Sequence, residues 1–322
     1  MLERTLIDTL LRPLARHPAA RGLGDDAAIL TPPLGRDLVL THDVLACGVH
    51  YLPADPPSDV AWKLLAVNLS DLAAMGARPI GVLMGLGLSS AEDDAWLTAF
   101  TDGLGRALEK WEVALLGGDT VAGLDRAVLG LTAIGEVAHG RALTRRAAQP
   151  GDELFVTGTI GDAGLGLAIA RGDADPDRYL LNRFRRPEPR LAMGQGLVGV
   201  ASAAMDVSDG LLIDAQRLAA ASGLRLAVDL TQLPLSDAAA ARTPRADDAL
   251  IERATAGDDY ELLFTAPPAA AAAVAALAAA CRVRVTRIGS VGEGDGLSIT
   301  GVGGRALRPA RLGYEHGGGG ST

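Results

Sequence analysis

Seven aspartates of this chain stand in what we expect to be short turns, most of them flanked by glycine or serine, and these turns could do chemistry. They are Gly24-Asp25-Asp26, Thr41-His42-Asp43, Ser70-Asp71, Gly117-Gly118-Asp119 and Asp206-Val207-Ser208-Asp209. Small neighbours let a carboxylate and its backbone come close to a bound ion or phosphate. Mg²⁺ is usually held by one or two carboxylates together with waters and substrate phosphates. Because seven carboxylates exceed the needs of one ion, the pattern predicts several magnesium ions and a nucleoside triphosphate.

Each aspartate taken alone also has a structural explanation, which outweighs the functional one. Asp26 could close an Asx turn, and Asp209 could stabilise a helix N-terminus. Asp71 is harder to explain, because it interrupts a long apolar segment with helical spacing. Burying several carboxylates together is costly unless cations neutralise them. The set as a whole therefore favours function.

Other catalytic motifs are missing from the sequence. No segment matches the P-loop pattern G-x-x-x-x-G-K-[ST]. The glycine-rich segment from Gly161 to Gly166 lacks the spacing of the dinucleotide fingerprint, so a close-packed helix start is the preferred interpretation. The five histidines are scattered, without the context of a Ser-His-Asp or Cys-His arrangement.

Composition narrows the class of protein further. A length of 322 residues favours two domains, and a net charge of −9 argues against nucleic acid or an anionic membrane as partner. Cys47 and Cys281 show neither metal-site nor disulfide spacing, so we expect a reduced, cytoplasmic location. No apolar run is long enough to span a bilayer, and the first eight residues indicate a short amphipathic helix.

Helices and strands are predicted in both halves, which indicates an α/β (α+β) fold of two domains. The first domain is expected over residues 1–147, the second over 148–316, and a flexible tail over 317–322. The strand 38–41 ends at Thr41-His42-Asp43, a helix from 58 to about 77 carries Asp71, and the strand 113–116 delivers Gly117-Gly118-Asp119. A helix through 221 follows Ser208-Asp209-Gly210, and an apolar, alanine-rich, packed helix is expected over 267–280.

The chain resembles the thiamine-monophosphate kinase family in several segments that occur in order between residues 22 and 316. The longest is Lys63-Leu64-Leu65-Ala66-Val67-Asn68-Leu69-Ser70-Asp71-Leu72-Ala73-Ala74-Met75-Gly76-Ala77. Others are Gly24-Asp25-Asp26-Ala27-Ala28, Thr41-His42-Asp43, Gly48-Val49-His50-Tyr51, Gly117-Gly118-Asp119-Thr120, Gly140-Arg141-Ala142-Leu143-Thr144-Arg145, Asp206-Val207-Ser208-Asp209-Gly210-Leu211, Gly257-Asp258-Asp259-Tyr260-Glu261-Leu262 and Gly313-Tyr314-Glu315-His316. The helix with Asn68 and Asp71 is specific to this family, whereas the glycine-aspartate pairs are shared with a wider superfamily of ATP-dependent synthetases.

The resemblance implies ATP-dependent phosphorylation of thiamine monophosphate to thiamine diphosphate with magnesium ions, and no protein nucleophile or base. It also implies a homodimer whose N-terminal domains share a β-barrel. Metal-ligand positions fall on Asp26, Thr41, His42, Asp43, Asp71, Asp119, Asp206 and Asp209. Positions that contact ATP fall on Gly118, Asp119, Arg145 and Ser208, and positions that contact the thiamine substrate fall on His50, Asp258 and Tyr314.

Two residues depart from the family pattern. His42 stands where threonine is common, which is harmless if the ligand there is a backbone carbonyl. Asp258 stands where glutamate is frequent, so its carboxylate reaches about one methylene less far toward the cationic thiazolium or the aminopyrimidine.

Other functions stay open at this point. A selenophosphate synthetase would need an N-terminal reactive cysteine beside a lysine, and a hydrogenase-maturation dehydratase a C-terminal cysteine; neither is present. An aminoimidazole-ribotide synthetase, a magnesium-dependent ATP hydrolase and a non-catalytic nucleotide-binding protein are the remaining alternatives.

Overall fold

The computed structural model describes residues 2–315, in two compact units. Unit 1 comprises Met1–Leu72, Ala77–Ala142 and Arg185–Pro187, and unit 2 comprises Ala73–Gly76, Leu143–Phe184 and Glu188–Thr322. Met1, His316 and the tail predicted over 317–322 lie outside the described residues. Together the units form a mixed α/β fold with two sheets.

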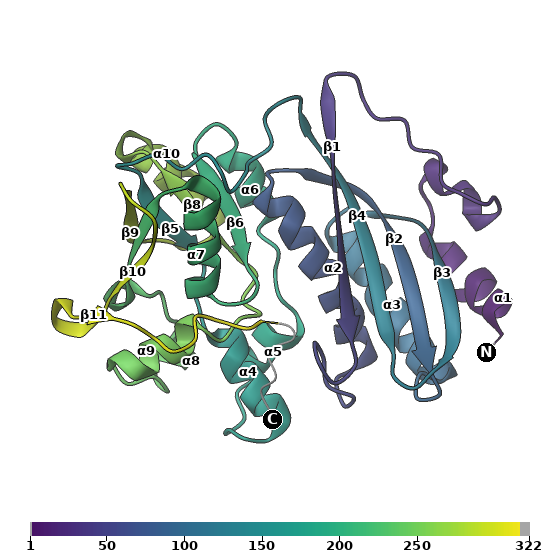
Figure 1. Cartoon of the computed structure of the whole chain (residues 1–322). Coiled ribbons are helices and arrows are strands. Elements are labelled where there is room, and N and C mark those ends of the chain that lie inside the picture. The colour runs from purple at the N-terminus through teal and green to yellow at the C-terminus, as the bar shows by residue number, and fades with distance from the viewer. Residues whose placement is uncertain (1, 316–322) are drawn as a thin grey trace. The chain divides into compact units, whose positions relative to one another are not determined.

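A four-stranded sheet forms the framework of unit 1 (Figure 1), in the order β1-β4-β2-β3. Its strands are β1 (Arg36–Ala46), β2 (Arg78–Ser89), β3 (Ala114–Leu124) and β4 (Val128–Ala138). β4 runs antiparallel to β1 and β2, while β2 and β3 are parallel and are joined by the helix α3 (Asp94–Lys110), as parallel strands require a crossover. The helix α2 (Pro57–Ala74) is buried along nearly its whole length, because apolar residues surround its axis.

Two predicted turns of unit 1 are strands in the structure. The strand expected to end at Thr41 continues to Ala46, so Asp43 lies inside β1. Gly117, Gly118 and Asp119 lie inside β3 rather than after it. Glycine is needed at position 118 because β3 and β2 approach each other closely there, and not because the chain turns. A Cβ on Gly118 would lie 2.0 Å from the carbonyl oxygen of Met84 on β2.

The N-terminal segment consists of short helical pieces beside β3 and α3 (Figure 1). These are α1 (Glu3–Leu6), a π-helical turn (Ile7–Leu11) and the 3₁₀ turns Arg12–Leu14 and Pro18–Leu23. Leu6, Leu11 and Ala20 are buried, so the segment is anchored by its apolar side chains.

The sheet of unit 1 is open, and one of its faces exposes apolar side chains. Leu38, Leu40 and Val44 alternate along β1 on that face, and Val128 on β4 and Val121 on β3 are exposed as well. β1 and β3 are edges, so residues 2–315 contain no closed barrel. The barrel expected to be shared by two chains stays a prediction.

A seven-stranded mixed sheet forms the framework of unit 2, in the order β11-β10-β7-β9-β5-β8-β6. Its strands are β5 (Glu153–Thr157), β6 (Ala203–Val207), β7 (Arg225–Asp229), β8 (Glu261–Ala266), β9 (Val285–Gly292), β10 (Gly296–Thr300) and β11 (Ala306–Leu307). Its helices are α4 (Asp162–Arg171), α5 (Arg178–Arg185), α6 (Leu191–Leu197), α7 (Leu211–Ser222), α8 (Asp237–Ala240), α9 (Asp247–Ala254) and α10 (Ala271–Cys281), with 3₁₀ turns at Leu230–Gln232, Pro268–Ala270 and Val302–Gly304.

Helices cover both faces of this sheet, because successive strand side chains point to opposite sides. Leu263 of β8 packs with Leu212 and Leu218 of α7, whereas Leu262 and Phe264 join the cluster of Met193 on α6 and Val274 on α10. The expectation that α10 is packed was wrong for most of its length, because Val274 is its one buried residue and its alanines mostly face solvent. Among residues 2–315, none of the helices combines the length and the apolar character that a membrane crossing requires.

Candidate active site

Three of the predicted metal-ligand residues meet where β1 faces α2. The hydroxyl of Thr41 donates a hydrogen bond of 2.5 Å to Oδ2 of Asp71. The backbone N–H of Asp43 donates to Oδ1 of the buried Asn68 at 2.9 Å, and Nδ2 of Asn68 donates to the carbonyl of Leu64 at 2.9 Å. Thr41 and Asp43 share one face of the strand, since they are two residues apart. The register between β1 and α2 is thus fixed by polar contacts at the predicted site.

His42 lies between these residues in sequence but on the opposite face of β1. Its Nδ1 is 2.9 Å from the hydroxyl of Thr132 on β4. The imidazole therefore does not join the side chains of Thr41 and Asp43. A ligand role of His42 in that group would have to use its backbone carbonyl.

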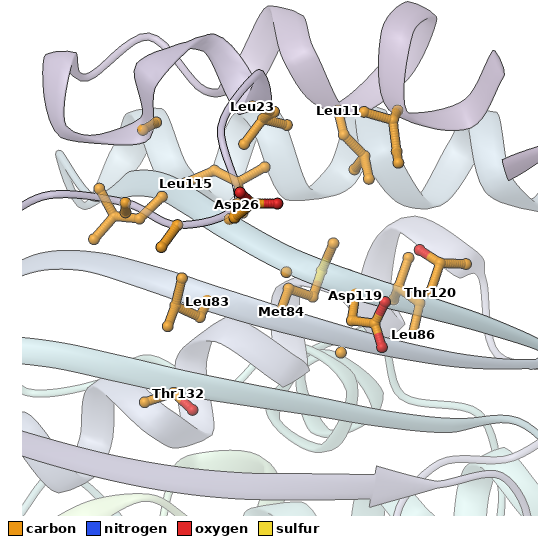
Figure 2. A pocket seen from close by; sticks show the side chains of 18 of the residues that line it. Leu11, Leu23, Asp26, Leu83, Met84, Leu86, Leu115, Asp119, Thr120 and Thr132 are labelled. Carbon is orange, nitrogen blue, oxygen red and sulfur yellow. The ribbon is translucent and has the colours of Figure 1, made fainter. Parts of the chain in front are cut away.

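A cavity of about 680 Å³ opens between the N-terminal segment and strands β2 and β3. Asp26, His42, Gly118 and Asp119 contribute to its lining, together with apolar side chains such as Leu115. Figure 2 shows Asp26 on the segment that passes over the strand of Met84, with Asp119 further along the cavity. Asp25 also lines the cavity but pairs with Arg21, which distinguishes it from its neighbour Asp26.

The donor set of unit 1 fits magnesium. Within residues 2–315 no three His, Cys, Asp or Glu side chains are arranged to hold one metal ion. Mg²⁺ does not require such a cluster, because waters and substrate phosphates complete its shell. The half-buried carboxylates of Asp43 and Asp71 and the hydroxyl of Thr41 are hard oxygen donors, whereas zinc would want nitrogen or sulfur.

His50, a predicted substrate contact, is held by the turn that follows β1. Its Nδ1 accepts a hydrogen bond from the backbone N–H of Ala46 at 3.1 Å. Its carbonyl accepts one from Nζ of Lys63 at 2.9 Å, and Lys63 is only 2% exposed. The buried lysine therefore fixes the position of the His50 backbone.

Three segments that are far apart in the sequence come together in unit 2. The backbone N–H of Asp258 donates to the carbonyl of Ser208 at 2.7 Å, and that of Tyr314 donates to the carbonyl of Asp209 at 2.9 Å. A Cβ on Gly257 would lie 2.9 Å from the Ser208 carbonyl, so glycine is required for this approach. The predicted ATP contact Ser208 and the predicted metal ligand Asp209 thus lie beside the predicted substrate contacts, Asp258 and Tyr314, at the end of β6.

An ion-pair network surrounds Asp209. Nη1 of Arg217 lies 2.5 Å from Oδ2 of Asp209 and 2.8 Å from Oδ1 of the buried Asp214. Oδ2 of Asp214 accepts hydrogen bonds of 3.1 Å from the backbone N–H groups of Ser208 and Asp209. Burial raises the pKa of Asp214 to about 6, although Arg217 opposes that rise. The network fixes the loop that holds Asp209.

Arg145 and Asp206 complete the predicted set. Arg145 is exposed, and its carbonyl accepts a hydrogen bond of 2.7 Å from the hydroxyl of Ser222. Asp206 is buried in β6, opposite Leu262 of β8.

Sequence reasoning missed Asp214 and Arg217, Lys63 as a support of His50, and Tyr260 beside Asp258. The spacing of Asp214 and Arg217, three apart on a helix that follows a predicted ligand, was a usable signal. Nothing in the sequence around Tyr260 indicated that its hydroxyl turns back toward Asp258.

Known proteins resemble this chain along nearly its full length. Residues 24–137 match the AIR synthase related protein, N-terminal domain, and residues 149–302 the AIR synthase related protein, C-terminal domain. A thiamine-monophosphate kinase of Caulobacter vibrioides is 44% identical over 316 residues, which cover 97% of this chain and 90% of that protein.

Two solved structures agree with this relationship. The thiamine-monophosphate kinase of Stenotrophomonas maltophilia superposes with a TM-score of 0.85 at 41% identity, covering 95% of this chain and 98% of the other. AaThiL, solved complexed with AMPPCP and TMP, superposes with a TM-score of 0.78 at 30% identity, covering 98% of this chain and 96% of the other. The chain therefore belongs to the thiamine-monophosphate kinase family, a family of phosphotransferases within the AIR synthase related proteins.

Proposed function

We propose that this chain transfers the γ-phosphoryl group of ATP to thiamine monophosphate, which yields thiamine diphosphate and ADP. The observation that carries the proposal is the meeting of residues 206–209, Asp258 and Tyr314 at the end of β6. Its support from a relative is AaThiL, which was solved with the ATP analogue AMPPCP and TMP.

The proposed reaction is an in-line transfer that needs no protein nucleophile or base. The acceptor is a phosphate monoester, which is largely ionised near neutral pH. Catalysis then depends on alignment and on neutralising the charge of two phosphate-bearing reactants. Bound magnesium would supply that neutralisation, held by the metal-ligand residues Asp26, Thr41, His42 (through its carbonyl), Asp43, Asp71, Asp119, Asp206 and Asp209.

The nucleotide is proposed to contact Gly118, Asp119, Arg145 and Ser208. Gly118 and Asp119 both line the cavity of unit 1, where a nucleotide could reach them. Arg145 is exposed and presents a forked donor that suits phosphate oxygens.

The thiamine moiety is proposed to contact His50, Asp258 and Tyr314. The carboxylate of Asp258 suits the cationic thiazolium or the amino group of the pyrimidine. Tyr314 is 43% exposed. The residue before it, Gly313, packs closely against the backbone of Asp209.

The open sheet face of unit 1 supports a homodimer. Leu38, Leu40 and Val44 form an apolar row on an edge strand, and such a row is covered in stable proteins. A second copy of the sheet would cover it and produce the shared barrel. We accordingly assign residues 1–147 to metal and ATP binding and dimerisation, and 148–316 to the second domain. We place the reaction in the cytoplasm as part of the same proposal.

The test is incubation of purified protein with ATP, magnesium and thiamine monophosphate, followed by chromatographic separation of the thiamine phosphates. Equal amounts of thiamine diphosphate and ADP, both abolished by a chelator, are expected. ATP consumption without thiamine diphosphate would instead indicate a hydrolase or a sister synthetase. Nucleotide binding without turnover would indicate a binding protein.

A further inference from the structure

The turn that carries Asp258 has a disfavoured backbone. Gly257, Asp258 and Tyr260 have φ values of +77°, +63° and +51°. Glycine adopts such angles readily, whereas a tyrosine does so rarely. Residues in this region persist where the surroundings hold them, and they gather at binding sites. The turn 257–260 is therefore a candidate for a preorganised recognition element.

Asp258 is the member of this turn whose side chain reaches solvent. Gly257, Asp259 and Tyr260 are buried, while Asp258 is half-buried. The hydroxyl of Tyr260 donates a hydrogen bond of 3.2 Å to Oδ1 of Asp258. The backbone N–H of Tyr260 is tied to the carbonyl of Val207 at 2.8 Å. One residue thus contacts both the outward-facing carboxylate and the neighbouring strand.

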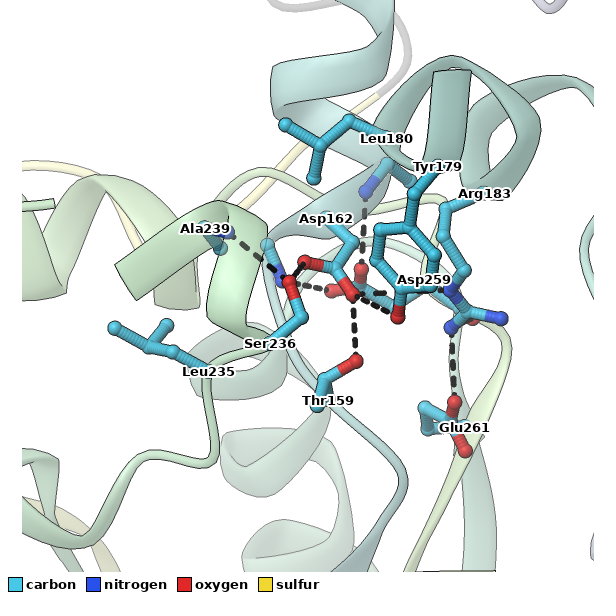
Figure 3. A network of polar contacts seen from close by, with 12 residues as sticks. Thr159, Asp162, Tyr179, Leu180, Arg183, Leu235, Ser236, Ala239, Asp259 and Glu261 are labelled. Carbon is cyan, nitrogen blue, oxygen red and sulfur yellow. Dashed lines mark hydrogen bonds and ion pairs between the residues drawn. The ribbon is translucent and has the colours of Figure 1, made fainter. Parts of the chain in front are cut away.

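Asp259 anchors the turn on its inner side. The two oxygens of its carboxyl group accept hydrogen bonds from the backbone N–H groups of Gly161 at 2.8 Å and Ala163 at 3.4 Å, at the start of α4. Nη2 of Arg183 donates to the carbonyl of Asp259 at 3.2 Å and to Oε1 of the buried Glu261 at 2.8 Å. Figure 3 shows Asp259, Arg183 and Glu261 side by side with Asp162, which accepts hydrogen bonds from Thr159, Tyr179 and Ser236 and lies 3.9 Å from Nε of Arg183.

We propose that Tyr260 and Asp259 are positioning residues that hold the Asp258 carboxylate ready for the cationic or amino part of the thiamine substrate. This inference rests on the proposed function. A carboxylate held before binding loses less freedom when the ligand arrives, so affinity rises without any new contact. The bond from Tyr260 fixes the side chain, and the anchor at Asp259 fixes the backbone.

The first test is a double-mutant cycle with Tyr260→Phe and Asp258→Asn. Tyr260→Phe is expected to raise KM for thiamine monophosphate about 3- to 10-fold, with kcat and the melting temperature unchanged. In the Asp258→Asn background the same change should have no further effect, because the hydroxyl acts through Asp258. Tyr179→Phe is the matched control: it removes a hydroxyl that donates to Asp162 at 3.0 Å, outside the turn.

The backbone anchor is tested with Asp259→Asn against Asp162→Asn. Both changes affect a fully buried carboxylate at the start of α4. Asp259→Asn alone should raise KM for thiamine monophosphate, whereas Asp162→Asn should leave that KM unchanged. Should Asp259→Asn not fold, the Tyr260→Phe cycle decides the matter.

Calorimetric titration of the same proteins with thiamine monophosphate gives Kd without turnover. A wild-type protein that binds but does not turn over would overturn the proposed function, and the Kd ratios would still decide the inference. An unchanged Kd and KM in Tyr260→Phe, or an equal increase in the Asp258→Asn background, would overturn the positioning role.

Discussion

Thr41 and Asp71, thirty residues apart in sequence, are joined by a hydrogen bond of 2.5 Å between a hydroxyl on β1 and a carboxylate on α2. A serine or threonine hydroxyl that donates to a carboxylate leaves its own lone pairs for a cation. The hydroxyl oxygen of Thr41 and the carboxylate of Asp71 can therefore bind the same cation.

Asp71→Asn is expected to lower kcat by about 10³-fold, because the variant loses a negative charge where charge must be neutralised. The amide oxygen can still accept from Thr41, so the fold should survive. Steady-state assays at saturating magnesium, with circular dichroism to monitor the fold, measure both. Activity near the wild-type level would contradict the multi-metal account.

Arg217→Gln is expected to lower the magnesium concentration that gives half-maximal activity several-fold, because Arg217 and the metal compete for Asp209. The same change should destabilise the protein by about 1–3 kcal/mol, since the buried Asp214 loses its cation. Magnesium titrations and thermal melts test the two effects. Arg225→Gln, at an exposed arginine of β7, should change neither.

Gly118→Ala is expected to destabilise unit 1 by about 1–3 kcal/mol, because its Cβ would lie 2.0 Å from the carbonyl of Met84 and force β3 away from β2. Thermal or urea unfolding measures the loss. Gly85→Ala is the matched control in the neighbouring strand, where the nearest atom to a Cβ lies 3.9 Å away. Equal stability of the two variants would show that β2 and β3 tolerate a wider spacing.

Asp259 is expected to make the stability of unit 2 depend on pH. Burial raises the pKa of its carboxyl from 3.8 to about 8, so between these values the native state holds a proton that the unfolded chain releases. The free energy of unfolding should therefore fall by up to about 1.4 kcal/mol per pH unit as pH rises through this window and level off above it. Urea unfolding at about pH 5 and about pH 9 should show this slope in the wild type and a smaller one in Asp259→Asn.

Leu40→Asp is expected to convert a dimer to a monomer, because Leu40 is 62% exposed in the middle of the apolar row on β1. Light scattering after size-exclusion chromatography measures the mass. Leu34→Asp is the control: Leu34 is fully exposed before β1 begins, and its change should leave the assembly intact. If the wild-type protein is a monomer, the proposal that two chains share a barrel is wrong.

The sequence predicted most elements and the segments of the site, but not the faces on which side chains lie. Gly118 looked like a turn residue because glycine is common in turns, yet a close approach between strands also requires it. His42 looked like a neighbour of Asp43, although the alternation of β1 places their side chains on opposite faces.

The contacts between distant segments that support the candidate site could not be predicted from the sequence either. The contact of Gly257 with Ser208 and that of Tyr314 with Asp209 depend on how β6, β8 and the last described residues pack together. Local sequence patterns carry no information on such pairs. The individual segments could therefore be predicted, but not the contacts between them. The helix α5 was missed because four of its eight residues are Arg or Asn, which obscures its apolar face.

The bond between Tyr314 and Asp209 also sets the order in which the site can be completed during synthesis. The chain emerges from the ribosome N-terminus first, so residues 206–209 and 257–260 are available long before Leu312 and Tyr314. Until those late residues arrive, the carbonyl of Asp209 and the N–H of Ile213 lack the backbone partners they have in the finished protein. A nascent or prematurely terminated chain without these residues therefore also lacks the two backbone hydrogen bonds that join its last segment to the candidate substrate site.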